Sequence, residues 1–425
     1  MSDAKRQRLA SPPSTPIDEG NQTGCHTRQK EQGGYQGYRF AEKVEGAPDP
    51  ILDVLSPVMD PQSFFENYVS KRRPCVLSGL PSDWKHAVTV EKMLERAGDG
   101  KVQVERRSDK HSPFGQNRND DRQVDMTFRE FVGKLRGEEK DLFYLSTQST
   151  ETSQNTSLFL TPCLQLLESG DLPGKLKIAG NLVLQSCNVW MGAAVGSSGL
   201  HHDFHDNFYV LLSGRKSFLL YPPSEAAHIP TYGTIDKVHP NGLISYQSRP
   251  TRADGVPDSI TQAKMSDEVE SENESADSSD DEDEAVLGRG FDYASDPEND
   301  DASAFLHGDH DDYETLIREE GERQGYKTVL RDEARPDHFA KPVGASCGEP
   351  NANPGIGCQI DLQAGQCLYL PASWFHSVTS YTEDFEGGNS IGPHIAFNYW
   401  FHPPDRNCFL APYTDDHWRH EDSNR

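Results

Sequence analysis

The sequence predicts a mainly β fold, a double-stranded β-helix or jelly roll, with an αβ segment in front of it and a long acidic insertion within it. Three observations predict this fold. Short apolar runs bounded by turn residues recur from Asn181 onward, as in barrels built from many short strands. Runs with helical and with strand periodicity alternate ahead of them. A segment that cannot bury apolar surface begins near Pro250, and strand-like runs resume only after it.

The 425 residues would allow two or three average domains, but all-β barrels routinely exceed the average length. We therefore expect one folded domain with two tails and one insertion. The expected divisions are a disordered tail over residues 1–49, a domain over 50–404 with its core in 50–249 and 351–404, a largely disordered acidic insertion over 250–350, and a polar C-terminal tail over 405–425.

The αβ segment begins near Ile51. Asp60 can cap a helix that has Pro61 at its first position, and Thr89 can cap a second helix. The elements expected in this segment are helices over 61–69, 90–97 and 128–135 and strands over 74–79, 101–106 and 142–146.

The barrel is expected to begin with a strand over residues 181–190. The stretch Ser197–Pro223 then reads as two strands around a turn at Ser213 and Gly214. The remaining strands are expected over 358–362, 366–370, 374–380 and 395–401.

The net charge of -27 is concentrated in the insertion. Residues 266–301 hold 16 Asp or Glu against one Arg, so this segment repels itself and should be extended. An acidic chain is a poor general binder of nucleic acid. Residues 313–330 of the insertion carry a weak helical pattern with few apolar anchors.

The sequence favours an intracellular protein. No apolar run reaches membrane-spanning length, and no secretory signal precedes the domain. The eight cysteines lack a C-x-x-C pair, and those in apolar runs (Cys75, Cys187 and Cys367) are expected to be buried, reduced thiols. The basic run Lys5–Arg8 favours the nucleus over the cytoplasm, although a merely solvated tail explains it equally well.

One His-x-Asp pair, His201 and Asp203, predicts a metal site. Residues two apart on a strand point to the same face, so this imidazole and this carboxylate can meet at one point. A further imidazole would complete the two-histidine, one-carboxylate set of non-haem Fe(II) oxygenases, and His376 in the stretch GQCLYLPASWFHSVTSY is the candidate. His205 is an alternative to His201, whereas His202 should point away as a supporting or surface residue.

Four motifs occur in a fixed order: the HxD with Asn-Phe four residues after its Asp, then SGRKSFLLYPP, LYLPxxWxH and HIAFNYW. Together they resemble the JmjC family of Fe(II)- and 2-oxoglutarate-dependent oxygenases. Within it, the chain is similar to the small JmjC-only hydroxylases related to the factor-inhibiting-HIF asparaginyl hydroxylase and the JmjC lysyl hydroxylases. RPCVLSG, beginning at Arg73, is similar to the RPxVLxG entry of those enzymes. The resemblance spans roughly Asp53–Pro223 and Gly355–Pro404.

The resemblance implies Fe(II), O2 and 2-oxoglutarate as cofactor and cosubstrates. The residues it assigns are His201, Asp203 and His376 as metal ligands and catalytic residues, Lys216 as the cosubstrate lysine, Tyr144 and Ser198 as supporting hydroxyls, and Asn207 and Asn398 as pocket asparagines.

Structural roles compete with some of these assignments. Lys216 could be a solvated strand lysine, Tyr144 a core residue and Ser198 a loop hydroxyl. Trp374 and Trp400 are expected in the core. His394 and His402, which lie near the last expected strand, receive no role.

The function implied is hydroxylation of a protein side chain with release of succinate and CO2. One alternative is a JmjC lysine demethylase using the same chemistry. Another is a catalytically silent jelly-roll scaffold that uses its acidic arm. The acidity favours a basic protein partner, such as a histone or ribosomal protein, over nucleic acid. A homodimer is compatible with the sequence.

Overall fold

The computed structural model describes residues 34–41, 49–81, 84, 88–107, 123–146, 158–193, 196–258, 336–341, 357–381 and 393–418. All of them belong to one unit, Gly33–Arg425. The basic run at residues 5–8 and the weak helical pattern at 313–330 lie outside the described residues. Within the described part, no helix is long and apolar enough to cross a membrane.

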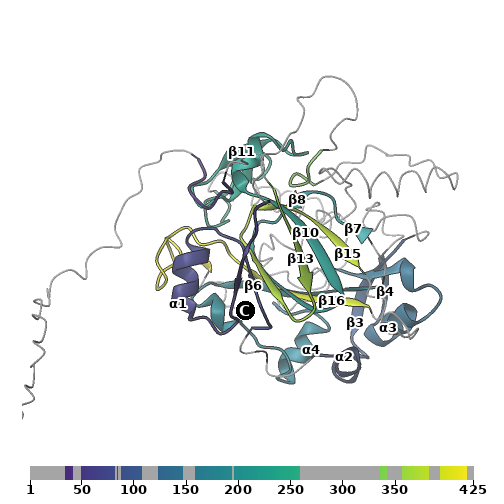
Figure 1. Cartoon of the computed structure of the whole chain (residues 1–425). Coiled ribbons are helices and arrows are strands. Elements are labelled where there is room, and N and C mark those ends of the chain that lie inside the picture. The colour runs from purple at the N-terminus through teal and green to yellow at the C-terminus, as the bar shows by residue number, and fades with distance from the viewer. Residues whose placement is uncertain are drawn as a thin grey trace, which may run out of the picture. The chain divides into compact units, whose positions relative to one another are not determined.

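The strands form two main sheets in which neighbours are often distant in sequence (Figure 1). The larger sheet runs from β1 (Asp53–Leu55) through β2 (Cys75–Leu77), β14 (Cys367–Leu370), β9 (Asp206–Ser213), β16 (His394–Phe401), β6 (Leu184–Gly192), β5 (Phe143–Leu145) and β3 (Lys101–Arg106) to β4 (Gln123–Thr127). The smaller sheet contains β13 (Cys358–Gln363), β10 (Arg215–Tyr221), β15 (Phe375–Tyr381) and β7 (Gly196–Ser197), and β8 (His201–His202) pairs with β15. This architecture confirms the predicted mainly β, jelly-roll fold.

Two apolar layers hold the sheets in place. Between the sheets, Tyr209 and Leu211 of β9 pack with Phe218 and Leu220 of β10. A second layer covers the other face of the larger sheet, where strands β6 and β16 pack against the helices. The helices are α1 (Pro61–Phe64), continued by a π-helix (Phe65–Val69), α2 (Val90–Ala97), α3 (Phe128–Arg136) and α4 (Cys163–Glu168).

Local capping determines where these helices begin. The Asp60 carboxylate accepts a hydrogen bond from the Ser63 amide, and the Thr89 hydroxyl accepts one from the Lys92 amide. Thr127 and Glu130 form a reciprocal capping box at the start of α3. The helices expected at these places are therefore confirmed, with α3 one residue longer than predicted.

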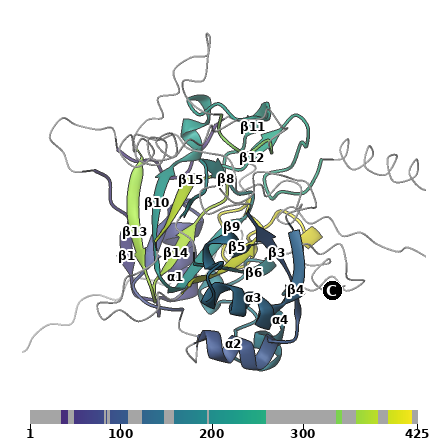
Figure 2. The same cartoon turned by 90° about the vertical axis from the view of Figure 1, so that its right-hand side faces the viewer.

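Strand β8, which carries the predicted ligand His201, lies at the end of the barrel away from α2, α3 and α4 (Figure 2). Strands β11 (Ile235–Val238) and β12 (Ile244–Tyr246) form a separate two-stranded sheet at that end, with β8 close to it (Figure 2). The contact between β8 and β12 includes a hydrogen bond between His202 Nε2 and Tyr246 Oη, at 2.8 Å.

Two segments pack more firmly than expected. Residues 251–258 and 336–341 fall within the span assigned to the acidic insertion, yet Val256 and Phe339 are buried. Residues 405–418 were expected to be a polar tail, but Trp418 is buried with its ring stacked on His402 at a centroid distance of 3.6 Å. Tyr413 in the same segment donates a hydrogen bond to the His402 carbonyl. A few buried apolar side chains thus pack these segments against the domain, although their composition is mainly polar.

The expected core residues are buried. Trp374 and Trp400 are in the core, and Cys75, Cys187 and Cys367 are free, buried thiols. The short strands β1 and β4 and helix α4 were not predicted individually. Strand β1 has only three residues, too few for a periodic pattern to be recognised.

Candidate metal centre

Strand pairing brings together the three residues predicted to bind a metal. Strand β8 runs antiparallel to β15 with His201 directly opposite His376, and Asp203 follows β8. One potential ligand atom from each residue lies within 4.8 Å of the other two. The distance from His376 Nε2 to Asp203 Oδ2 is 3.4 Å. A single ion could therefore contact all three side chains.

Backbone carbonyls orient both imidazoles for metal binding. His201 Nδ1 lies 2.8 Å from the Gly199 carbonyl oxygen, and His376 Nδ1 lies 2.9 Å from the Trp374 carbonyl oxygen. Because a carbonyl oxygen can only accept, each Nδ1 must carry the proton and each Nε2 keeps its lone pair. This outer hydrogen bond is the one that metal-ligating histidines ordinarily make. The donor set thus fits a divalent cation.

The electrostatics agree with that fit. Burial and, second, the neighbouring His376 lower the pKa of His201 to about 4, so His201 is neutral near pH 7. Burial alone would raise the pKa of Asp203, but His376 and His201 outweigh burial and hold that pKa below its usual range. Two imidazoles with free lone pairs and one ionised carboxylate form the ligand set of non-haem Fe(II) sites, which leaves open coordination positions.

A four-residue turn, Pro371–Trp374, positions two of these ligands. The Ser373 amide donates a hydrogen bond to the Asp203 carbonyl at 2.7 Å, while the Trp374 carbonyl accepts the His376 bond already described. The Ala372 amide donates to Asp206 Oδ1 at 2.9 Å. The placement of this turn therefore sets the placement of the metal ligands.

Asp206 is in turn held by a buried ion pair. Arg72 donates to both of its carboxylate oxygens, with nitrogen–oxygen distances of 2.9 and 2.5 Å. The Tyr369 hydroxyl donates to the same carboxylate at 2.7 Å. The side chains of Arg72 and Asp206 are only 3% and 0% exposed, so the pair is screened from water.

Backbone strain is concentrated in this network. Arg72 has φ of 52° and Ser373 has φ of 62°, in the left-handed region that non-glycine residues rarely adopt. The Trp374 indole donates to the Arg72 carbonyl at 3.2 Å, and the Ser373 hydroxyl accepts from the Ile244 amide at 2.9 Å. Such conformations persist where surrounding contacts over-determine them, as they do here.

The two neighbouring histidines do not belong to the ligand cluster. His202 is buried and hydrogen-bonded to Tyr246, and burial lowers its pKa to about 3. It is a supporting residue rather than a surface residue. His205, the alternative to His201, packs its ring on His402 at 5.3 Å, away from the three-residue cluster.

Phe339 is a site residue that sequence reasoning missed. Its ring stacks on the His201 imidazole with a centroid distance of 4.9 Å and an interplanar angle of 14°. The Ala340 amide donates to the Leu200 carbonyl at 2.9 Å, so this short segment pairs with the chain beside β8. The only available signal was the apolar pair Phe339-Ala340 in a polar stretch.

Lys216 is placed inside the barrel, as a residue that binds an anion would be. Its side chain is 2% exposed, and its ammonium donates to the Ser380 hydroxyl at 2.5 Å. Among the described residues no carboxylate forms an ion pair with it. Burial lowers its pKa to about 7. A buried ammonium without a counter-ion fits the distal carboxylate of an anionic cosubstrate.

The other predicted pocket residues surround the same interior. Asn207 and Asn398 are buried, and the Oδ1 atom of each has no hydrogen-bond partner within the part of the chain that the structure describes. The Tyr144 ring lies 5.7 Å from the ring of His394. The Ser198 hydroxyl accepts a hydrogen bond from the Val378 amide at 2.9 Å, on the strand that carries His376. These polar groups fit a pocket for a polar ligand, and their individual roles remain predictions.

Comparison with known proteins adds independent evidence. A family model described as "Cupin-like domain" matches residues 61–407. The chain is 32% identical over 443 residues to JmjC domain-containing protein 4 of Schizosaccharomyces pombe, covering 90% of each. It is 26% identical over 176 residues to the human bifunctional peptidase and (3S)-lysyl hydroxylase JMJD7, covering 40% of this chain and 54% of that one. A 63-residue match at 38% identity links 14% of the chain to 12% of lysine-specific demethylase JMJ31 of Arabidopsis thaliana.

Proposed function

The chain belongs to the cupin-like JmjC family, and from this premise we propose that it is an Fe(II)- and 2-oxoglutarate-dependent oxygenase that hydroxylates a protein side chain. Succinate and CO2 are the co-products. The observation that carries the proposal is the convergence of His201, Asp203 and His376 within 4.8 Å, with both histidine Nε2 atoms free to bind.

Bound Fe(II) would supply the oxygen chemistry, using 2-oxoglutarate as the source of two electrons. The protein's own contribution is to hold and orient. His201, Asp203 and His376 would hold the ion and leave its other positions to cosubstrate and O2. Lys216, buried inside the barrel, would supply a cation that orients the cosubstrate. His376 is buried, whereas His201 and Asp203 remain partly exposed.

One consideration favours hydroxylation over demethylation, and a second indicates the kind of substrate. The relative named as a lysyl hydroxylase aligns over 40% of this chain, whereas the one named as a demethylase aligns over 14%. The net charge of -27 also favours a basic segment of a protein as substrate, since opposite charge raises the encounter rate. We therefore propose a side chain within a lysine-rich or arginine-rich segment as the target. Demethylation of an N-methyl-lysine is the second candidate, supported by the shorter match alone.

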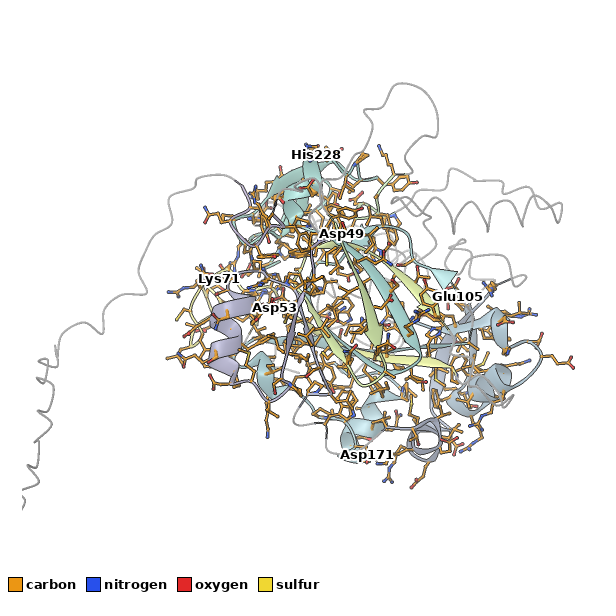
Figure 3. The ribbon with its side chains drawn as sticks, viewed as in Figure 1. Asp49, Asp53, Lys71, Glu105, Asp171 and His228 are labelled. Atoms are coloured by element: carbon orange, nitrogen blue, oxygen red, sulfur yellow. The ribbon has the colours of Figure 1, made fainter. Side chains whose placement is uncertain are left out.

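Turnover of 2-oxoglutarate to succinate by purified protein with Fe(II) tests the proposal. His201→Ala and Asp203→Ala should abolish it, because each removes a ligand. His228→Ala is the matched control: this histidine is 61% exposed, at the end of the molecule that carries β11 (Figure 3).

The modified substrate separates the two reactions. Mass spectrometry of treated basic proteins should show a gain of roughly 16 Da for hydroxylation or a loss of about 14 Da for demethylation. Turnover without substrate can be slow, so binding of Fe(II) and 2-oxoglutarate is measured in parallel. Absence of both binding events would contradict the oxygenase proposal and favour a silent scaffold.

A further inference from the structure

His394, the first residue of β16, is buried, and among the described residues it has no hydrogen-bond partner. It is 1% exposed, and neither ring nitrogen meets a donor or acceptor in that part of the chain. Burying a polar group without a hydrogen bond is costly, and such groups in a folded protein call for a specific explanation. An imidazole with two unsatisfied nitrogens inside a barrel is explained by a ligand that arrives later.

Two glycines make room around this imidazole. Gly192 is its partner on β6, where a Cβ would come within 2.5 Å of the Tyr144 ring and 3.4 Å of His394 Cε1. Gly214 forms the turn between β9 and β10 with φ of +83°, and a Cβ there would lie 2.8 Å from His394 Cβ. Both glycines therefore allow the Tyr144 and His394 rings to lie together at the barrel interior.

Lys216 lies just beyond that turn, so a cation and an imidazole share this part of the barrel. Burial lowers the pKa of His394 well below its usual range, and the positive charge of Lys216 lowers it further. The ring is therefore neutral near pH 7, with one N–H donor and one acceptor nitrogen. A neutral donor adds a hydrogen bond without repelling the ammonium beside it.

We infer that His394 binds the cosubstrate, donating its ring N–H to the distal carboxylate of 2-oxoglutarate beside the Lys216 ammonium. The inference rests on the proposed function and extends it. Lys216 supplies the charge and His394 supplies a directed donor, so the pair selects 2-oxo acids that carry a second carboxylate. The residue thereby determines cosubstrate specificity.

Calorimetry with Mn(II)-loaded protein, which binds cosubstrate without turnover, tests this inference. The two ligands compared are 2-oxoglutarate and 2-oxobutyrate, which lacks only the distal carboxylate group. His394→Phe keeps an aromatic ring and removes both nitrogens, whereas His394→Gln keeps an N–H donor. We expect His394→Phe to weaken 2-oxoglutarate binding about 10- to 100-fold, the factor for one hydrogen bond to a charged group, with an intermediate loss for His394→Gln.

The second ligand and a matched variant make the result specific. Binding of 2-oxobutyrate by His394→Phe should change by less than about threefold, because the lost donor faces a group that this ligand lacks. His402→Phe makes the same substitution one residue after β16, where the ring stacks on Trp418, and should leave 2-oxoglutarate binding intact. Equal weakening of both ligands, or unchanged 2-oxoglutarate affinity in His394→Phe, would overturn the inference.

A measurement on the wild-type protein covers the case in which His394→Phe does not fold. With Zn(II) in the site and ¹⁵N-labelled histidine, 2-oxoglutarate should shift one imidazole signal that 2-oxobutyrate leaves unchanged, and that signal should be missing in His394→Gln. If both ligands shift the same signals, His394 does not contact the distal carboxylate. If wild-type protein binds neither metal nor 2-oxoglutarate, the proposed function itself fails, which is a different outcome.

Discussion

Replacing Arg72 by glutamine removes the cation from the buried pair with Asp206. The carboxylate keeps its bonds from Tyr369 and the Ala372 amide but loses both guanidinium donors. Breaking a buried ion pair from one side costs about 3–5 kcal/mol, because the remaining charge stays buried without compensation. For a folded domain of about 150–250 residues the melting temperature falls roughly 2–4 °C for each kcal/mol, so the expected loss is at most about 6–20 °C.

The next residue provides a matched control. Arg73 pairs with Asp53 at 2.9 Å, but the two side chains are 34% and 35% exposed. Water screens such a pair, and exposed pairs contribute about 0–1 kcal/mol. Arg73→Gln is the same chemical change one position along the chain, and its melting temperature should fall by less than about 4 °C.

Thermal and urea unfolding followed by circular dichroism would measure both variants. The Pro371–Trp374 turn is anchored on Asp206 and orients Asp203 and His376. Arg72→Gln should therefore also weaken Mn(II) binding, by at most the 10- to 100-fold that losing a direct outer partner of a ligand costs. Arg73→Gln should not. Equal melting temperatures for the two variants would refute the argument from burial. Unchanged metal affinity in a destabilised Arg72→Gln protein would refute the link to the metal centre.

Three further predictions concern the site. His376→Ala should lower the affinity for Fe(II) or Mn(II) by more than about 100-fold, since losing even a residue that only hydrogen-bonds to a ligand costs 10- to 100-fold. Calorimetry with His228→Ala as the control would measure this loss. The affinity for 2-oxoglutarate should fall as pH rises above about 7, because the Lys216 amine, with a pKa of about 7, becomes increasingly neutral. The Lys216→Met variant should bind 2-oxoglutarate weakly, with little change in affinity between about pH 6.5 and 8.5. Phe339→Ala removes the ring stacked on His201 and should cost about 3–5 kcal/mol in urea unfolding while weakening metal binding; unaltered stability would mean that the segment carrying it contributes no packing.

The same lysine gives a linked prediction for stability. An unfolded lysine binds its proton up to about pH 10.4, whereas folded Lys216 releases it near pH 7. Between these values the unfolded state holds more protons, so this group makes the free energy of unfolding of the ligand-free protein rise with pH. Lys216→Met should reduce that rise, as measured by urea unfolding at pH 7 and pH 9.

Much of the fold was predictable because it depends on neighbouring residues. The cap at Thr89 and the proline at position 61 act within one helical turn, so the sequence alone locates those helix starts. Strand alternation likewise predicted that His201 and Asp203 face one point, and the structure brings them together although β8 ends at His202. The composition of the insertion could not identify Phe339 as a buried residue, because a single buried aromatic outweighs its polar neighbours.

By itself, then, the sequence determined the barrel, its αβ prelude and the candidate ligands, because periodicity, capping and motif order are properties of short stretches. Only the tertiary structure decided which of those stretches contact one another. The ion pair between Arg72 and Asp206 joins residues 134 positions apart. The burial of His394 depends on the pairing of its strand, β16, with β6 and β9. Burial removes the water that would otherwise solvate these side chains. A buried arginine or histidine therefore costs free energy unless a specific partner replaces that water.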